Sequence, residues 1–180
     1  MSLKLTYMGQ NDSVNCTPNV ILTGDPGTDQ QTLAAAGFNG GVIVALIPPS
    51  AGVYTNQPAF GTIGAIYPCD ADNAQDGAHA SYPFATLLNN GGEFSGSIGP
   101  SGSKRAPVVR AMWQGMVDYQ GYDANATFLL GQPLYCGGAT HTNIGLYTSS
   151  ARKGTGSSIV GYCTHVPQGT EVWLGIASAL

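Results

Sequence analysis

The chain has 180 residues, of which only 9% are charged, and its formal net charge is −4. An average soluble domain is about 25% charged, so this composition excludes coiled coils and charge-rich disordered chains. The slight acidic excess argues against a nucleic-acid-binding protein. The 26 glycines and 11 prolines favour a turn-rich domain, and a weakly charged surface favours association with other proteins.

The N-terminus shows no signal-peptide pattern, and the longest strongly apolar run covers only residues 42–47. A membrane-spanning helix needs about 20 apolar residues, so we expect no membrane partner and no export by the usual route. In a reducing compartment the cysteines would remain thiols. They are Cys16, Cys69, Cys136 and Cys163.

The first third predicts few regular elements. Residues 3–8 alternate between apolar and polar, which predicts a strand, and residues 9–19 look like a polar loop. We therefore divide the chain into an N-terminal strand and arm, residues 1–19, and a single β-rich domain over 20–180. A short helix is expected over 30–36, and a buried strand over 42–47 after an Asn-Gly-Gly turn.

The middle of the chain, residues 50–105, is irregular. In it, 60–67 could be a strand interrupted by glycines, 80–88 could be a helix turn or a strand, and 96–105 is expected to be a flexible loop. The last third is clearer, because short apolar runs alternate with turn residues at roughly ten-residue spacing. The strands predicted there cover 106–119, 128–130, 134–135, 143–147, 158–163 and 171–177. The fold class is therefore mainly β, an antiparallel barrel or sandwich with one or two short helices, clearest in 106–180.

Metal and catalytic motifs are weak. Cys136, His141, Cys163 and His165 could converge on zinc, but their spacing matches no zinc signature, and two core thiols with two polar histidines is the other interpretation. The acidic stretch 70–77 lacks the residues of an EF-hand loop, which leaves a solvated acidic loop or a calcium site of another kind, since carboxylates two positions apart can converge in a loop. No nucleophile elbow or paired acids stand out. We expect a protein that is not an enzyme and needs no cofactor or metal.

Three features point to binding surfaces. Two basic pairs lie in Gly/Ser-rich loops, where they are either solvated tips or prongs for an acidic protein partner. Two tyrosines share the polar loop 119–122 and suggest exposed interface rings. The edge of the first strand could pair with another chain. The interface candidates are Leu3, Leu5, Tyr7, Lys104, Arg105, Tyr119, Tyr122, Arg152 and Lys153.

Residues 106–180 resemble the β-rich module of the head decoration (cement) proteins of tailed bacteriophages. The resemblance is carried by Phe-Leu-Leu-Gly-Gln-Pro-Leu-Tyr at 128–135, Gly-Gly at 137–138, Ile-Val-Gly-Tyr-Cys at 159–163 and Val-Trp-Leu-Gly-Ile at 172–176. It implies a structural protein that is made in the host cytoplasm, binds the major capsid protein on the virion exterior and stabilises the shell. By the same analogy we expect a homotrimer, with a dimer as the alternative.

Two other classes of function remain open. One is a receptor- or carbohydrate-binding β module of a phage fibre, which would stack ligands on Trp113, Tyr119 or Tyr122. The other is a small hydrolase whose site the sequence does not reveal.

Overall fold

The computed structural model describes residues 3–8, 14–17, 40–47, 65–72, 84–87, 106–109 and 113–179. Their regular structure is almost entirely strand, and the helix in these ranges is a single 3-10 turn, η2 (Ala139–His141). The prediction of a mainly β protein is confirmed. The expected helix at 30–36 lies outside the described residues. Within the described ranges no helix is long and apolar enough to cross a membrane.

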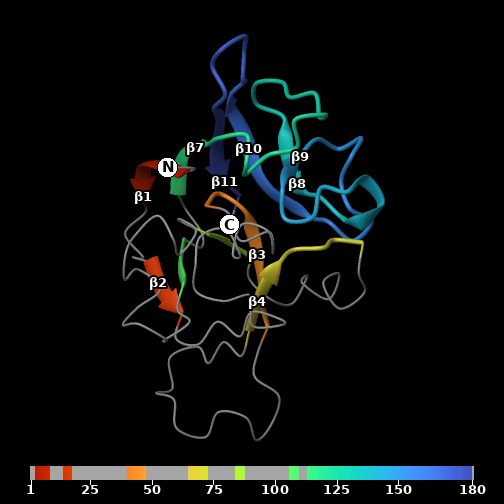
Figure 1. Ribbon diagram of the computed structural model, residues 1–180. Coiled ribbons are helices and arrows are strands. Elements are labelled where there is room, and N and C mark those ends of the chain that lie inside the picture. The colour runs from red at the N-terminus through yellow and green to blue at the C-terminus, as the bar shows by residue number, and fades with distance from the viewer. Residues whose placement is uncertain are drawn as a thin grey trace, which may run out of the picture.

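Six strands form one antiparallel sheet in the order β1-β7-β11-β10-β8-β9 (Figure 1). The bounds of these strands are β1 Leu3–Met8, β7 Trp113–Val117, β8 Pro133–Cys136, β9 Tyr147–Thr148, β10 Ile159–His165 and β11 Leu174–Ser178. β1 pairs with β7 through Leu3 opposite Val117 and Leu5 opposite Gly115. The predicted N-terminal strand is therefore confirmed, and it forms an edge of this sheet.

Five further strands form a second antiparallel sheet in the order β2-β6-β5-β3-β4. Its strands are β2 Val14–Thr17, β3 Ile43–Ile47, β4 Ala65–Pro68, β5 Phe84–Leu87 and β6 Ala106–Val109. β3 is the predicted apolar strand, and Gly41 at φ 89° occupies the turn before it. A positive φ suits glycine because it has no Cβ to clash with the backbone.

The core lies on one face of the six-stranded sheet and also contains β3. β7 alternates, with Trp113 and Val117 buried and Gln114 exposed, as expected for a strand with one face in the core. The buried cluster is made of Ile43, Cys69, Ala71, Trp113, Val117, Tyr122, Phe128, Leu134, Cys136, Tyr147, Val160, Cys163, Leu174 and Ile176. It joins residues from both sheets.

Backbone hydrogen bonds connect the start of β3 to a loop beside the other sheet. Ile43 N donates to Gly145 O (2.7 Å), and Gly145 N donates to Cys69 O (2.7 Å). Buried backbone groups need such partners, since an unpaired buried group is costly. The loop around Gly145 therefore satisfies backbone groups that the strands leave unpaired.

Several predicted strand boundaries are wrong. The run predicted as one strand over 106–119 is two strands, β6 and β7, in different sheets, and β2 lies inside the stretch expected to be loop. Residues 128–130 and most of 143–147 form loops and turns. Their apolar side chains made both segments resemble strands, but Phe128 packs in the core from a loop.

Candidate functional site

The loop that follows β7 is organised around the carboxylate of Asp123. Asp123 Oδ2 accepts hydrogen bonds from Arg152 Nε (2.6 Å) and Asn143 Nδ2 (2.7 Å), and Thr148 Oγ1 donates to it at 3.2 Å. The other oxygen, Oδ1, accepts from Asn125 N at 2.9 Å. One buried carboxylate thus holds three loops together.

The surroundings of Asp123 keep it ionised. Burial raises the pKa of this carboxyl group, but the hydrogen bonds from Arg152 and Asn143 outweigh that effect and leave the pKa below its usual value. Arg152 is 28% exposed while Asp123 is buried. The pair is a structural ion pair, and Arg152 is not a wholly solvated loop tip.

Backbone bonds fix the same loop against β9. Tyr147 N donates to Gly121 O, and Asp123 N donates to Tyr147 O, both at 2.9 Å. The Tyr147 ring is buried, and its hydroxyl lies 2.5 Å from Thr86 Oγ1. Burial raises the pKa of Tyr147 well above its ordinary value. This tyrosine therefore stays neutral and structural.

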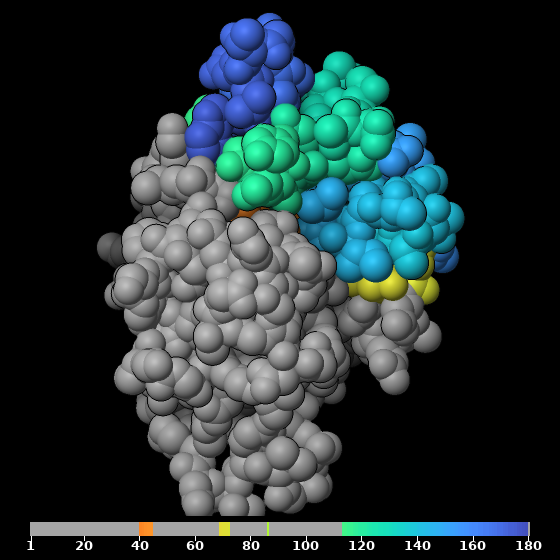
Figure 2. Space-filling model, viewed as in Figure 1, coloured from red at the N-terminus to blue at the C-terminus, as the bar shows by residue number. Residues whose placement is uncertain are grey.

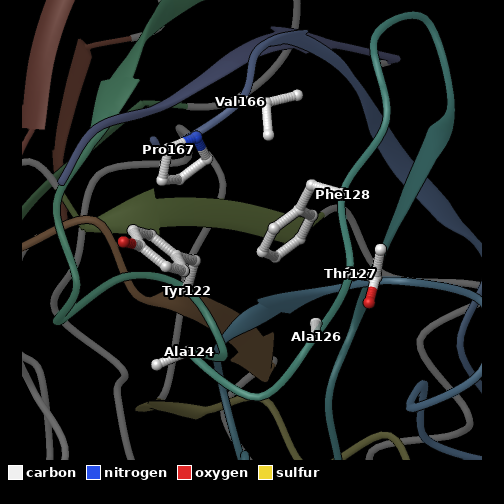
Figure 3. A pocket seen from close by; sticks show the side chains of 7 residues that line it. All are labelled: Tyr122, Ala124, Ala126, Thr127, Phe128, Val166 and Pro167. Carbon is white, nitrogen blue, oxygen red and sulfur yellow. The ribbon is translucent and has the colours of Figure 1, made fainter. Parts of the chain in front are cut away.

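A pocket of about 340 Å³ opens beside this loop (Figure 3). Its walls come from residues 122–128 and from the segment that follows β10. The lining residues are Tyr122, Ala124, Ala126, Thr127, Phe128, Val166 and Pro167. The Tyr122 and Phe128 rings meet edge to face, with centroids 5.7 Å apart, and Figure 3 shows Pro167 next to Tyr122. The packed rings make a firm apolar wall.

Asp70 and Asp72, the aspartates of the acidic stretch 70–77 that the structure describes, each hold a loop through hydrogen bonds. Asp72 Oδ2 accepts from Thr140 N (2.8 Å), and Asp72 Oδ1 accepts from both the backbone N (2.7 Å) and the hydroxyl (2.9 Å) of Thr155. Asp70 Oδ1 accepts from Ala139 N at 2.9 Å. The N–H groups hold the pKa of Asp72 far below its ordinary value. Because donors already occupy both oxygens of Asp72, this carboxylate is poorly placed to bind a cation.

Three of the four candidate zinc ligands, Cys136, Cys163 and His165, lie beside separate partners. Cys136 Sγ donates to Cys69 O (3.3 Å), and Cys163 Sγ donates to His165 O (3.4 Å). His165 Nε2 lies 3.4 Å from Glu171 Oε1 and makes no hydrogen bond, although this nitrogen is buried. In the part of the chain that the structure describes, no three His, Cys, Asp or Glu side chains are grouped to hold a metal.

The two tyrosines of loop 119–122 differ from each other. Tyr119 is 60% exposed, as the sequence suggests, but Tyr122 is only 7% exposed and forms part of the pocket wall. The expectation of two exposed rings is therefore wrong for Tyr122. Burial, and then the nearby charge of Asp118, raise the pKa of its hydroxyl.

The basic interface candidates are not all described by the structure, and Lys153 is one that is. Lys153 is exposed, and its Nζ lies 4.7 Å from the centroid of the Tyr135 ring, a cation–π contact. Lys104 and Arg105 lie outside the described residues. The backbone of Leu3, Leu5 and Tyr7 is placed in β1, and Trp113, one of the three stacking candidates, is buried.

Sequence reasoning missed the Asp123 hub and the pocket. Asp123 stands between Tyr122 and Ala124 without any motif, and its partners follow 20, 25 and 29 positions later. Only the fold brings such distant residues together. Comparisons with protein-family models, with curated proteins and with solved structures found no match for this chain.

Proposed function

We propose that this chain is a structural protein of a tailed-phage virion that binds the outer surface of the capsid and stabilises it. The observation that carries the proposal is how the described side chains are used. The carboxylates of Asp72 and Asp123 hold loops together, while large apolar side chains remain exposed on loops and on β10. This combination suits a durable binding part better than a catalyst.

Several large apolar side chains are exposed on this protein, in which only 9% of the residues are charged. Those that the structure describes as exposed are Tyr119, Leu129, Leu130, Ile144, Ile159, Tyr162 and Val172. Leu129 and Leu130 are adjacent in this set, and contiguous exposed apolar residues mark interaction surfaces. They support a protein partner, for which the resemblance of residues 106–180 to decoration proteins suggests the major capsid protein.

For the finer architecture we propose a sandwich of the two antiparallel sheets. The buried cluster supports it, because Ile43 of β3 packs with Trp113 and Val117 of β7, a strand of the other sheet. The protein would be made in the host cytoplasm and act on the capsid exterior as a homo-oligomer, a trimer by the family resemblance or a dimer. It would need neither a cofactor nor nucleic acid.

The test is co-sedimentation of the purified protein with expanded capsids built from the major capsid protein encoded near its gene. We expect saturable binding and greater resistance of the capsid to heat or chelator. Replacing the exposed ring in Tyr119→Ala should weaken binding, and Thr170→Ala, at another exposed position, is the control. A gene neighbourhood without capsid genes, together with no co-sedimentation, would refute the proposal.

A second candidate, a carbohydrate- or receptor-binding module, is favoured by the aromatic pocket of Figure 3. Sugars stack on aromatic rings, and the pocket also offers the Thr127 hydroxyl. A glycan array separates the candidates, because the capsid proposal expects no glycan signal that depends on Phe128.

A further inference from the structure

The end of the molecule beyond β8 and β10 carries a fixed apolar tip. Leu129 and Leu130 are 56% and 69% exposed. Their turn is held by hydrogen bonds from Gln132 N to Leu129 O (3.1 Å) and from Gly131 N to Cys163 O (2.8 Å), with Gly131 at φ 75°. Because the turn is already ordered, burying its leucines costs little further conformational entropy.

The pocket lies directly beside this tip. Phe128, which lines the pocket, precedes Leu129 in the chain, and Val166 and Pro167 also line the pocket. Figure 2 shows the segments that contain them, green to teal and deep blue, next to each other at the top of the molecule. The pocket volume is about 340 Å³, and an apolar group that displaces poorly ordered water from such a site gains affinity.

The residues of the tip and of the pocket lining have no charged side chains. Residues 124–135 and 166–170 contain no Asp, Glu, Lys, Arg or His. Asp123, at the base of the loop, is buried and paired with Arg152. Two copies of this chain can therefore bring these residues together with no charged side chain inside the contact, although Glu171 directly follows the pocket segment and each copy has a net charge of −4.

From these observations we infer that the pocket receives the Leu129–Leu130 tip of a second copy of this chain. In a two-fold dimer the same patch of each copy meets the other, so a projection and its receiving pocket must lie on one patch. The adjacency of tip and pocket satisfies that requirement. Each copy inserts its tip between Phe128 and Pro167 of the other, and the dimer contains two equivalent contacts.

Analytical ultracentrifugation of the full chain tests this inference without any capsid, so its outcome is independent of the proposed function. We expect a monomer–dimer equilibrium. Leu130→Ser removes the projection, and Ala124→Trp fills the pocket from an exposed lining position. Each variant should raise the dimer dissociation constant by at least about tenfold, the effect typical of a central interface residue. Ile144→Ser, which removes an equally apolar exposed side chain from another loop, should leave it unchanged.

A mixing experiment makes the test specific. The Leu130→Ser copy retains an open pocket and the Ala124→Trp copy retains the tip, so an equimolar mixture should form more dimer than either variant alone. Near-ultraviolet circular dichroism of each variant shows whether its core is intact. A full-length protein that stays monomeric at high micromolar concentration overturns the inference. An oligomer that resists both substitutions in variants with intact cores overturns it too.

Discussion

At the scale of single residues, we expect the substitution of Asp123 to lower the free energy of unfolding more than that of any other described carboxylate. Asp123→Asn removes the negative charge that pairs with Arg152. The new side-chain amide presents to Asn143 Nδ2 either its NH2 group, which cannot accept a hydrogen bond, or its oxygen, which accepts more weakly than a carboxylate. Hydrogen bonds to charged groups contribute about 1.5–3 kcal/mol, so we expect the free energy of unfolding to fall by roughly 2–3 kcal/mol. Urea unfolding measures it. Glu171→Gln, the same change at an exposed carboxylate, should stay within about 0.5 kcal/mol of the parent, and equal losses in the two variants would contradict the role of Asp123.

The pH dependence of stability follows from the same carboxylates. The pKa values of Asp72 and Asp123 are both lowered in the folded state from an ordinary value of 3.8. Their contributions are therefore present above that value and are lost as the pH falls through the folded-state pKa values. We expect the unfolding free energy to change little between pH 7 and about pH 5, and to decline below about pH 4. In Asp123→Asn the acid-induced decline should be smaller, and an equally steep decline would show that other groups cause it.

At the scale of elements, the loops are held by side chains that act as backbone partners. Asp72 joins the 3-10 turn η2 to the loop that contains Thr155, and Gly138 packs so closely against the Asp72 carboxylate that an added Cβ would collide with it. Gly138 has φ −153°, an extended conformation open to any residue, so the constraint there is steric alone.

We therefore expect Gly138→Ala to lower the free energy of unfolding by about 1–3 kcal/mol, the usual cost of overpacking. It should also speed amide hydrogen exchange at Thr140 and Thr155, whose N–H groups bond Asp72. Nuclear magnetic resonance measures both amides. Ala139→Ser, at the neighbouring exposed position, is the control, and unchanged exchange in Gly138→Ala would contradict the role of Asp72.

The elements also show what the sequence could and could not predict. Strands with a regular apolar pattern and clear turns, such as β1, β3 and β10, are found where they were expected. The strand predicted over 128–130 is wrong, because Phe128 enters the core from a loop while Leu129 and Leu130 face solvent. Asn143 lies in the strand predicted over 143–147, but its buried side-chain amide donates a hydrogen bond to Asp123 from a loop. A local apolar pattern does not distinguish a strand from a loop, because the contacts that decide both cases involve residues far away in the chain.

At the scale of the whole molecule, the N-terminal strand connects the predicted arm to the rest of the fold. β7 lies between β1 and β11, so removing residues 1–8 would leave the backbone groups along one side of β7 without their partners. An exposed strand edge offers a template for pairing with other chains. The segment is thus a structural part of the sheet, in addition to the expectation from the sequence that its edge pairs with another chain.

Deletion of residues 1–8 should therefore lower stability as well as any capsid attachment. Losing the partner of a central strand should cost at least about 2 kcal/mol, which for a chain of this length lowers the unfolding temperature by roughly 4–8 °C. Differential scanning calorimetry measures the shift, and size-exclusion chromatography should show new association through the exposed edge of β7. A synthetic peptide of residues 1–8 should restore the unfolding temperature by adding a strand back to the sheet, whereas a scrambled peptide should not. If the truncated protein unfolds at the parent temperature and stays unassociated, β1 does not stabilise the sheet, and its contribution would have to be sought in contacts with a partner.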